Sequence, residues 1–153
     1  MGYTTGFDGE FNLQFRDEKS KEVVTELVNG LAKTRRVTRD LSHLVGELDQ
    51  PINYYGVDGE FYHGDENSSI INNNEPPRTQ PGLWLQWVIE EDSLYWDEGE
   101  KFYNYVEWLQ YLIDKIFKPN DVIVNGKVEW FGEECDDTGE IIVTDNTIVI
   151  NNI

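Results

Sequence analysis

Cysteine and histidine are nearly absent from this chain of 153 residues, which has one cysteine and two histidines. A single cysteine, Cys135, excludes an internal disulfide and a zinc site built from several thiolates. Neither His43 nor His63 has a second histidine or a cysteine at the spacing of metal ligands. We therefore expect no bound metal and no other cofactor.

Long apolar runs and phosphate-binding loops are missing as well. No stretch approaches the roughly 18 apolar residues that a membrane span requires, and the N-terminus lacks the basic and apolar regions of a secretory signal peptide. The sequence contains neither a P-loop with its lysine nor a GxGxxG turn. These features predict a cytoplasmic protein that does not contact membranes.

Basic residues are few, because 12 Lys and Arg stand against 30 Asp and Glu for a formal net charge of -18. Nucleic-acid binding depends on cations that displace phosphate counterions, so this charge argues against direct binding to nucleic acid. Residues 1–39 hold seven basic and six acidic side chains, whereas residues 40–153 hold five and 24. Such acidity either keeps a protein soluble or lets it occupy a basic groove on a partner.

Aromatic residues, in contrast, are plentiful, with 5 Trp, 8 Tyr and 7 Phe. Their number argues against disorder, and the length suits one domain with a proper core. A domain of this size cannot bury all of them, and exposed Trp and Tyr commonly anchor interfaces or stack on bases. Those that compete for burial are Trp84, Trp96, Trp130, Tyr54, Tyr55, Tyr62, Tyr103 and Tyr111.

The first third of the chain has clear periodicity. Alternating apolar residues predict a strand over residues 3–15, and apolar residues three and four apart predict a helix from Asp17 or Ser20 to about residue 33. The helical pattern can continue over Thr34–Val45. Such a helix would place three arginines on one surface.

The middle of the chain is rich in helix breakers. Residues 46–82 contain four prolines and five glycines, so we expect a long irregular segment, with a short hairpin over residues 54–62. A strand over Leu83–Ile89 has apolar residues on both faces, as in a central strand, and Leu94-Tyr95-Trp96 can return antiparallel to it.

The last third combines one helix with several strands. The longest apolar stripe predicts a helix capped by Asp97 and ended by Pro119. Two tight turns, Asn125-Gly126 and Asp145-Asn146, predict antiparallel hairpins on either side of an acidic loop over residues 133–139. The whole chain, 1–153, therefore predicts a single α+β domain with a largely antiparallel sheet and two helices packed on one of its faces.

Arg35, Arg36 and Arg39 form the basic cluster. Guanidinium groups bind phosphate bidentately, so the cluster is a candidate anion site, with Trp84 or Trp96 stacked on a nucleobase. Pairing of the same arginines with acidic groups of the protein explains them without any ligand. The first interpretation predicts a domain that captures a phosphorylated small molecule or nucleotide.

Carboxylates crowd the turn that follows Trp130. A carboxyl group with a raised pKa beside an aromatic side chain can act as a general acid, which makes Glu129 and Asp137 the residues of a hypothetical hydrolase. A solvated acidic turn explains the same residues without chemistry. As a binding surface, the candidate residues are Glu129, Trp130, Glu133, Glu134, Asp136 and Asp137, joined by Tyr54, Tyr55 and Tyr62.

Several segments along nearly the whole chain share one pattern: Gly2-Tyr3-Thr4-Thr5, Thr34-Arg35-Arg36, Gln80-Pro81-Gly82-Leu83-Trp84 with Gln86-Trp87, Glu100-Lys101-Phe102-Tyr103 with Tyr105 and Trp108, Asn125-Gly126-Lys127-Val128-Glu129-Trp130 and Asp145-Asn146. In these segments the chain resembles a family of small, acidic proteins of bacterial and phage genomes that has no assigned activity. The resemblance implies a phage or mobile-element setting and adds no chemistry.

The leading hypothesis from the sequence is a non-enzymatic binding protein. It would engage a host protein with a basic surface through acidic and aromatic side chains, as a phage accessory or anti-defence factor does. Capture of a phosphorylated small molecule and carboxylate-based hydrolysis are the alternatives, and a homo-oligomer is also open.

Overall fold

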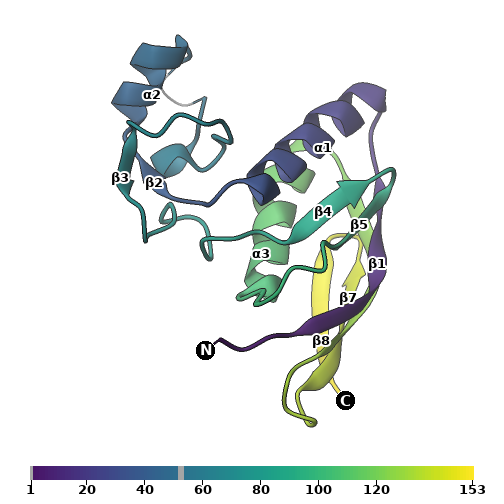
Figure 1. The fold of residues 1–153 in the computed structure, drawn as a ribbon. Helices are drawn as coiled ribbons and strands as arrows, with labels where there is room; N and C mark the ends of the chain where they lie inside the picture. Colours follow the sequence, from purple (N-terminus) through teal and green to yellow (C-terminus); the bar gives the residue numbers. More distant parts are fainter. Residues whose placement is uncertain (1, 52–53) are drawn as a thin grey trace.

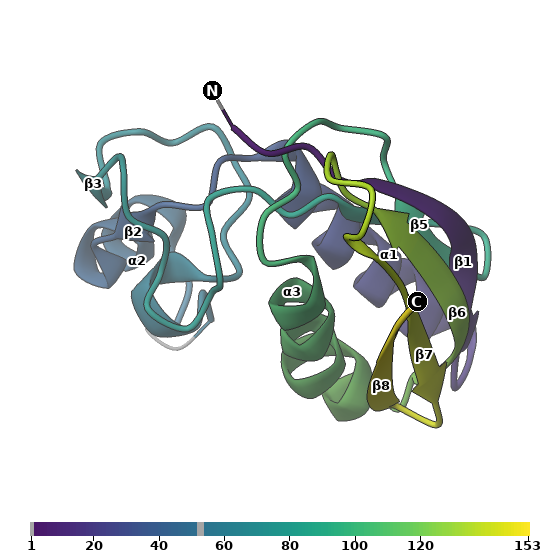
Figure 2. The same ribbon diagram turned by 90° about the horizontal axis from the view of Figure 1, so that it is seen from below.

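The computed structural model describes residues 2–51 and 54–153, and its centre is a six-stranded antiparallel sheet in the order β4-β5-β1-β6-β7-β8. Helices α1 and α3 lie on one face of this sheet (Figures 1 and 2). The strands are β1 (Gly6–Gln14), β2 (Thr38–Arg39), β3 (Ile70–Asn72), β4 (Trp87–Glu90), β5 (Ser93–Trp96), β6 (Ile123–Phe131), β7 (Thr138–Thr144) and β8 (Thr147–Asn152). The helices are α1 (Glu18–Lys33), α2 (Leu41–Leu48) and α3 (Tyr105–Leu112), with the short 3-10 helices η1 (Val57–Gly59) and η3 (Lys118–Asn120) and the π-helix η2 (Ile113–Phe117). The predicted α+β class is confirmed.

The alternation of apolar and polar residues in β1 determines which of its side chains lie in the main core. Phe7, Phe11 and Leu13 are buried under the helices, while the residues between them lie on the outer face. Asp17 caps α1, as predicted, by accepting a hydrogen bond from the Ser20 N–H at 2.8 Å. The apolar stripe of α1 then packs on the sheet side of the molecule, because alternate strand residues and residues three or four apart in a helix each share one face.

A second, smaller core lies apart from the sheet. Leu44, Tyr55 and Tyr62 form it, beneath α2 and beside the β2–β3 pair. We call residues 36–80 the small lobe; Figure 1 shows it at the upper left, attached beside the end of α1. The expected irregular segment, 46–82, makes up most of this lobe, with β3 as its strand.

The predicted continuation of the first helix over Thr34–Val45 is wrong for residues 34–40, and only Leu41–Val45 are helical, as part of the separate helix α2. The chain leaves α1 at Thr34, where the backbone becomes extended. From there its peptide groups bond to distant carbonyl groups, the Arg36 N–H to Leu83 at 2.7 Å and the Thr38 N–H to Glu75 at 2.9 Å. Helical periodicity carries no information about such long-range bonds, which here replace those of the helix.

The predicted hairpin over residues 54–62 is also wrong. In place of two strands, the chain makes the tight turn η1, and the Phe61 N–H bonds to the Tyr55 carbonyl at 2.9 Å. Tyr55 and Tyr62 are buried in the small core, which fixes the two ends of this turn without a strand ladder.

The helix predicted to start at Asp97, which is α3, begins later than predicted. Asp97 accepts a hydrogen bond from the Gly99 N–H at 2.8 Å and so stabilises a turn. Positive φ angles at Glu98, Lys101 and Asn104 then keep the chain out of a helix until α3 begins at Tyr105. The α-helix ends at Leu112, before the predicted end at Pro119, and the chain continues through η2 and η3, with Pro119 inside η3.

The predictions about strand pairing have different outcomes. The pairing of β4 with β5 and the turn at Asp145-Asn146 are confirmed. The predicted hairpin at Asn125-Gly126 is wrong, since β6 runs straight through it. Strand β4 begins at Trp87, later than the predicted Leu83, and it is an edge strand and not a central one, with α1 along its free side.

Gly126 shows why this dipeptide is not a turn. Its φ is +136°, and an added Cβ would lie 3.0 Å from the Phe11 Cα and the Glu10 carbonyl oxygen. Gly126 thus lets β6 approach β1 closely in mid-strand.

Replacement of two glycines by alanine tests this account. Gly126→Ala is expected to lower the free energy of unfolding by about 1–3 kcal/mol, because both the backbone angle and the contact become strained. Gly46→Ala in α2 is the matched control: an added Cβ there meets nothing within 4 Å, so alanine should raise stability by up to about 1 kcal/mol. Urea unfolding measures both, and equal effects of the two variants would contradict the account.

Candidate functional site

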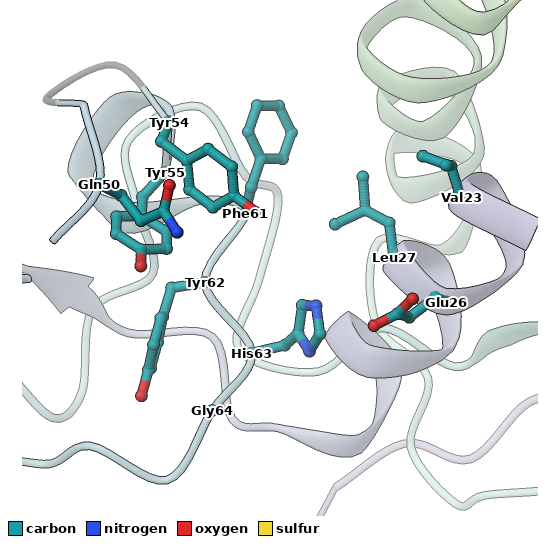
Figure 3. A pocket seen from close by; sticks show the side chains of 10 residues that line it. All are labelled: Val23, Glu26, Leu27, Gln50, Tyr54, Tyr55, Phe61, Tyr62, His63 and Gly64. Atoms are coloured by element: carbon teal, nitrogen blue, oxygen red, sulfur yellow. The ribbon is translucent and has the colours of Figure 1, made fainter. Parts of the chain in front are cut away.

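A cleft of about 560 Å³ separates α1 from the small lobe (Figure 3). Aromatic and aliphatic side chains dominate its walls, and among the described residues that line it only Glu26 is acidic. The lining residues are Val23, Glu26 and Leu27 from α1, and Gln50, Tyr54, Tyr55, Phe61, Tyr62, His63 and Gly64 from the small lobe. An apolar hollow with a few polar groups at its edge is the usual form of a binding site.

The structure brings together the three tyrosines that the sequence marked for binding. The ring of Tyr54 lies 4.9 Å from that of Tyr55, which lies 5.6 Å from that of Tyr62, both in edge-to-face geometry. Tyr54 remains 57% exposed, whereas the other two are buried. Burial raises the pKa of Tyr55, so its hydroxyl stays protonated at neutral pH. Tyr54 is thus the ring with the largest free surface for a partner.

His63 and Glu26, which the sequence interpretation missed, point toward each other from opposite walls of the cleft (Figure 3). The imidazole of His63 packs directly on Gly30 of α1, and a Cβ at that position would overlap the ring. A glycine inside a helix costs about 1 kcal/mol relative to alanine. The presence of a glycine within the helical pattern is therefore the one feature of the sequence that indicates a close approach of another segment to α1.

Arg36 holds the floor of the small lobe in place. Its guanidinium is 1% exposed and donates to the carbonyl groups of Tyr62 at 2.6 Å and Glu60 at 3.3 Å, and to the side chains of Gln80 and Thr34. Burial lowers its pKa to about 10, so it remains charged at neutral pH. A buried cation with these acceptors serves to fix the backbone around the cleft.

A buried carboxylate continues this network toward α3. Glu60, 2% exposed, accepts hydrogen bonds from the hydroxyls of Tyr111 at 2.9 Å and of Thr79. The side chain of Gln80 joins Tyr111 at 3.1 Å to the Glu60 carbonyl at 2.8 Å. Burial raises the pKa of Tyr111, which therefore stays a donor. The network ties the small lobe to the helix on the sheet.

Arg39 stabilises the other side of the lobe. Its guanidinium lies 4.5 Å from the ring centre of Tyr62 and donates to the Ser69 hydroxyl at 2.9 Å and to the Glu66 carbonyl. The hydroxyl of Ser69, with the N–H groups of Ser68 and Ser69, lowers the pKa of Glu66 to about 2. One face of Tyr62 is therefore already occupied by a cation of the same chain.

The arginine cluster thus acts within the fold. Arg35, the most accessible of the three, donates to the Asn73 carbonyl at 3.0 Å and to the Asn74 side chain at 3.4 Å. Trp96 packs on Phe7 of the main core and donates its N–H to the Gly99 carbonyl, and Trp84 is exposed. All three guanidinium nitrogens of Arg36 donate to oxygens of the fold, as do Nε and Nη2 of Arg35 and Nη1 of Arg39.

The acidic turn is likewise tied to the rest of the protein. Asp137 accepts hydrogen bonds from the Tyr3 hydroxyl at 2.7 Å and from the indole N–H of the buried Trp130 at 2.9 Å, and both lower its pKa. Glu133 accepts from the Thr4 N–H at 2.7 Å. These bonds fasten the N-terminal segment to the turn and leave Glu134 and Asp136 facing solvent.

The hypothetical hydrolase pair is not assembled. Trp130 points into the core side of the sheet and binds Asp137 there, so the neighbouring Glu129 faces the outer side. Glu129 lies 3.8 Å from Lys127, on that outer face. In Figure 1 this turn lies at the bottom of the molecule, whereas the small lobe lies at the upper left.

The outer face of the sheet, which none of the described helices covers, is acidic. Asp8, Glu129 and Glu140 stand in register on β1, β6 and β7, and like charges directly opposite each other destabilise a sheet. Lys127 offsets them in part, at 3.6 Å from Glu140. The acidic field of the protein is therefore strong on a side that the fold leaves open.

Comparison with protein-family models, with curated proteins and with solved structures finds no match to the chain. Among residues 2–51 and 54–153, no group of three or more His, Cys, Asp or Glu side chains is placed to hold a metal ion. None of the helices in the described ranges is long and apolar enough to cross a bilayer.

Substitution of the two arginines separates their roles. Arg36→Lys should lower the free energy of unfolding by about 2–3 kcal/mol, because one ammonium group cannot reach all four acceptors. Arg35→Lys, at a half-exposed position, should change it little. Urea unfolding gives both values, and a stable Arg36→Lys variant would mean that the guanidinium does not hold the lobe.

Acid titration tests the role of Glu66. A carboxylate whose pKa is lowered from 4.5 to about 2 stabilises the fold fully above pH 4.5 and loses that effect as the pH falls toward 2. Glu66→Gln should therefore melt at a lower temperature than the parent at pH 7, and the difference should shrink below pH 4.5. Glu47→Gln, at an exposed position of α2, is the control, and a difference independent of pH would refute the assignment.

Proposed function

We propose that this protein is a non-enzymatic binding protein that takes a basic segment of a partner protein into the cleft between α1 and the small lobe. The observation that carries this proposal is the cleft itself, an aromatic hollow with a carboxylate at its edge on a protein of charge -18. Aromatic side chains in a desolvated hollow supply most of the affinity of many protein interfaces.

The chemistry of the cleft favours a cationic side chain with an aliphatic stem. Lys and Arg bury their methylene groups against apolar surface while the charged end reaches a carboxylate, here that of Glu26. The exposed ring of Tyr54 offers a π face to such a cation. Arg39 over the ring of Tyr62 is an example of the same contact within this chain.

The charge distribution supports a basic partner over a phosphorylated one. The acidic outer face and the net charge attract cations over long range and accelerate their association at low salt. A phosphate group would be repelled by this field, and Arg36, the most buried of the three arginines, has all three guanidinium nitrogens engaged inside the lobe. The carboxylate pair of the hydrolase hypothesis lies on opposite sides of the sheet, so binding is the better-supported function.

An anti-defence role is the specific form of this function that the resemblance to phage proteins suggests. In that form the captured segment belongs to a host protein with a basic surface. The acidic turn would then contribute through Glu134 and Asp136, which face solvent, more than through the residues that hold the turn together.

Selection from a peptide library tests the proposal. Random peptides displayed on phage and panned against the protein should become enriched in Lys and Arg beside apolar residues. An enriched peptide, labelled with a fluorophore, should then bind at least about fivefold more weakly to Tyr54→Ala and to Glu26→Lys, a loss of about 1 kcal/mol.

Two variants outside the cleft serve as controls. Tyr103→Ala removes a tyrosine of similar exposure, 51%, and Glu107→Lys makes the same charge change on α3. Both should bind the peptide nearly as well as the parent. Enrichment of acidic peptides, or equal losses in the cleft variants and the controls, would refute the proposal.

A further inference from the structure

The last strand leaves one edge of the sheet open. The Ile153 N–H bonds to the Thr138 carbonyl at 3.0 Å. In an antiparallel pair every second residue directs its N–H and C=O toward the neighbouring strand, so the peptide groups of Thr147, Val149 and Asn151 also point toward β7. Those of Ile148 and Ile150 therefore point away from the sheet. Figure 1 shows β8 at the margin of the sheet, where unpaired peptide groups can accept another strand.

The opposite edge of the same sheet is closed. The side-chain amide of Asn29, from α1, accepts from the Ile89 N–H at 2.8 Å and donates to the Ile89 carbonyl at 2.9 Å. It thereby satisfies the outward peptide groups of β4 as a neighbouring strand would. The fold thus protects one edge with a dedicated side chain and leaves β8 without any such contact among the described residues.

Strand β8 also lacks the residues that normally prevent edge pairing. Residues 146–153 contain no Lys, Arg, Asp, Glu or Pro, although the chain as a whole carries a charge of -18. Val149 is 49% exposed and Ile150 40%. Charged residues, prolines and bulges are the usual protections of edge strands, and their absence makes this strand suited to pairing.

We propose that β8 pairs with β8 of a second copy, antiparallel about a two-fold axis through Val149. In this register Val149 faces Val149 of the second copy on the outer side of the sheet. On the inner side Ile148 faces Ile150 of the second copy. The outward peptide groups of both isoleucines then meet as hydrogen-bonded pairs. A two-fold interface requires such self-complementarity.

The neighbouring register, centred on Ile150, fits less well. It would place Val149 opposite Asn151 and Ile148 opposite Asn152, so apolar and amide side chains would alternate across the seam. A basic partner strand, in turn, would find no carboxylate on β8. The neutral strand of a second copy is the partner that the side chains match, and salt should strengthen the pairing by screening the charge of each copy.

Sedimentation equilibrium of the full chain tests the pairing. The parent is expected to sediment as a dimer, and Val149→Lys should weaken the dimer at least about tenfold, because it places two like charges opposite each other. Val149→Thr keeps a neutral branched side chain and should still dimerise. Ile123→Lys places the same charge on the outer face within the interior strand β6 and should also leave the dimer intact.

Cysteine cross-linking tests the register. In a Cys135→Ser background, Val149→Cys should form an intermolecular disulfide under mild oxidation, since non-hydrogen-bonded pairs bring Cα atoms to about 4.5 Å. Thr147→Cys faces Asn151 of the second copy and should not cross-link. A monomeric parent at all concentrations and salt strengths, a dimer that Val149→Lys leaves intact, or cross-linking through position 147 alone would overturn the proposal.

Discussion

The small lobe depends on one buried cation. The guanidinium of Arg36 is withdrawn from water, which is costly unless every N–H finds an acceptor. Its acceptors, on Thr34, Glu60, Tyr62 and Gln80, are far apart in a part of the chain that has little regular structure. By holding the carbonyl groups of Glu60 and Tyr62, it fixes the direction in which Phe61 and His63 leave the backbone. The carboxylate of Glu60 extends the same network to α3, so the position of the cleft wall is set by polar bonds more than by its small apolar core.

The acidic charge and the aromatic surplus have different locations and different effects. Ten of the 20 aromatic side chains are buried, among them Trp130, whose indole N–H donates to Asp137 of the acidic turn. The exposed ring of Tyr54 lies at the cleft beside Tyr55, Phe61 and Tyr62, whereas the row of Asp8, Glu129 and Glu140 spreads over the open face of the sheet. Charge of this kind guides encounter and sets salt dependence, while an aromatic hollow determines how long a partner stays.

The local patterns in the sequence were sufficient for much of the fold. The alternation in β1, the cap of α1 and the turn at Asp145-Asn146 could be predicted because each depends on residues close together in the chain. The path of Arg35 and Arg36 could not, since its bonds reach Leu83 and residues of the small lobe across long stretches of sequence. The hairpin predicted at Asn125-Gly126 was wrong for a similar reason. Asparagine followed by glycine is typical of a turn, but here Gly126 permits the close approach of β1. At the cleft, the large number of aromatic residues led to the prediction that Tyr54, Tyr55 and Tyr62 take part in binding. Nothing in the sequence indicated Glu26 or His63 except the glycine inside α1, Gly30.

The central claim is that the cleft between α1 and the small lobe is the binding site for a basic segment. Hydrogen–deuterium exchange, followed by mass spectrometry with and without a bound basic peptide, tests it most directly. The account predicts slower exchange in α1 around Val23–Gly30 and in the segment over residues 54–64, with little change elsewhere. Protection confined to the acidic turn or to the outer strands of the sheet, with the cleft unchanged, would contradict it.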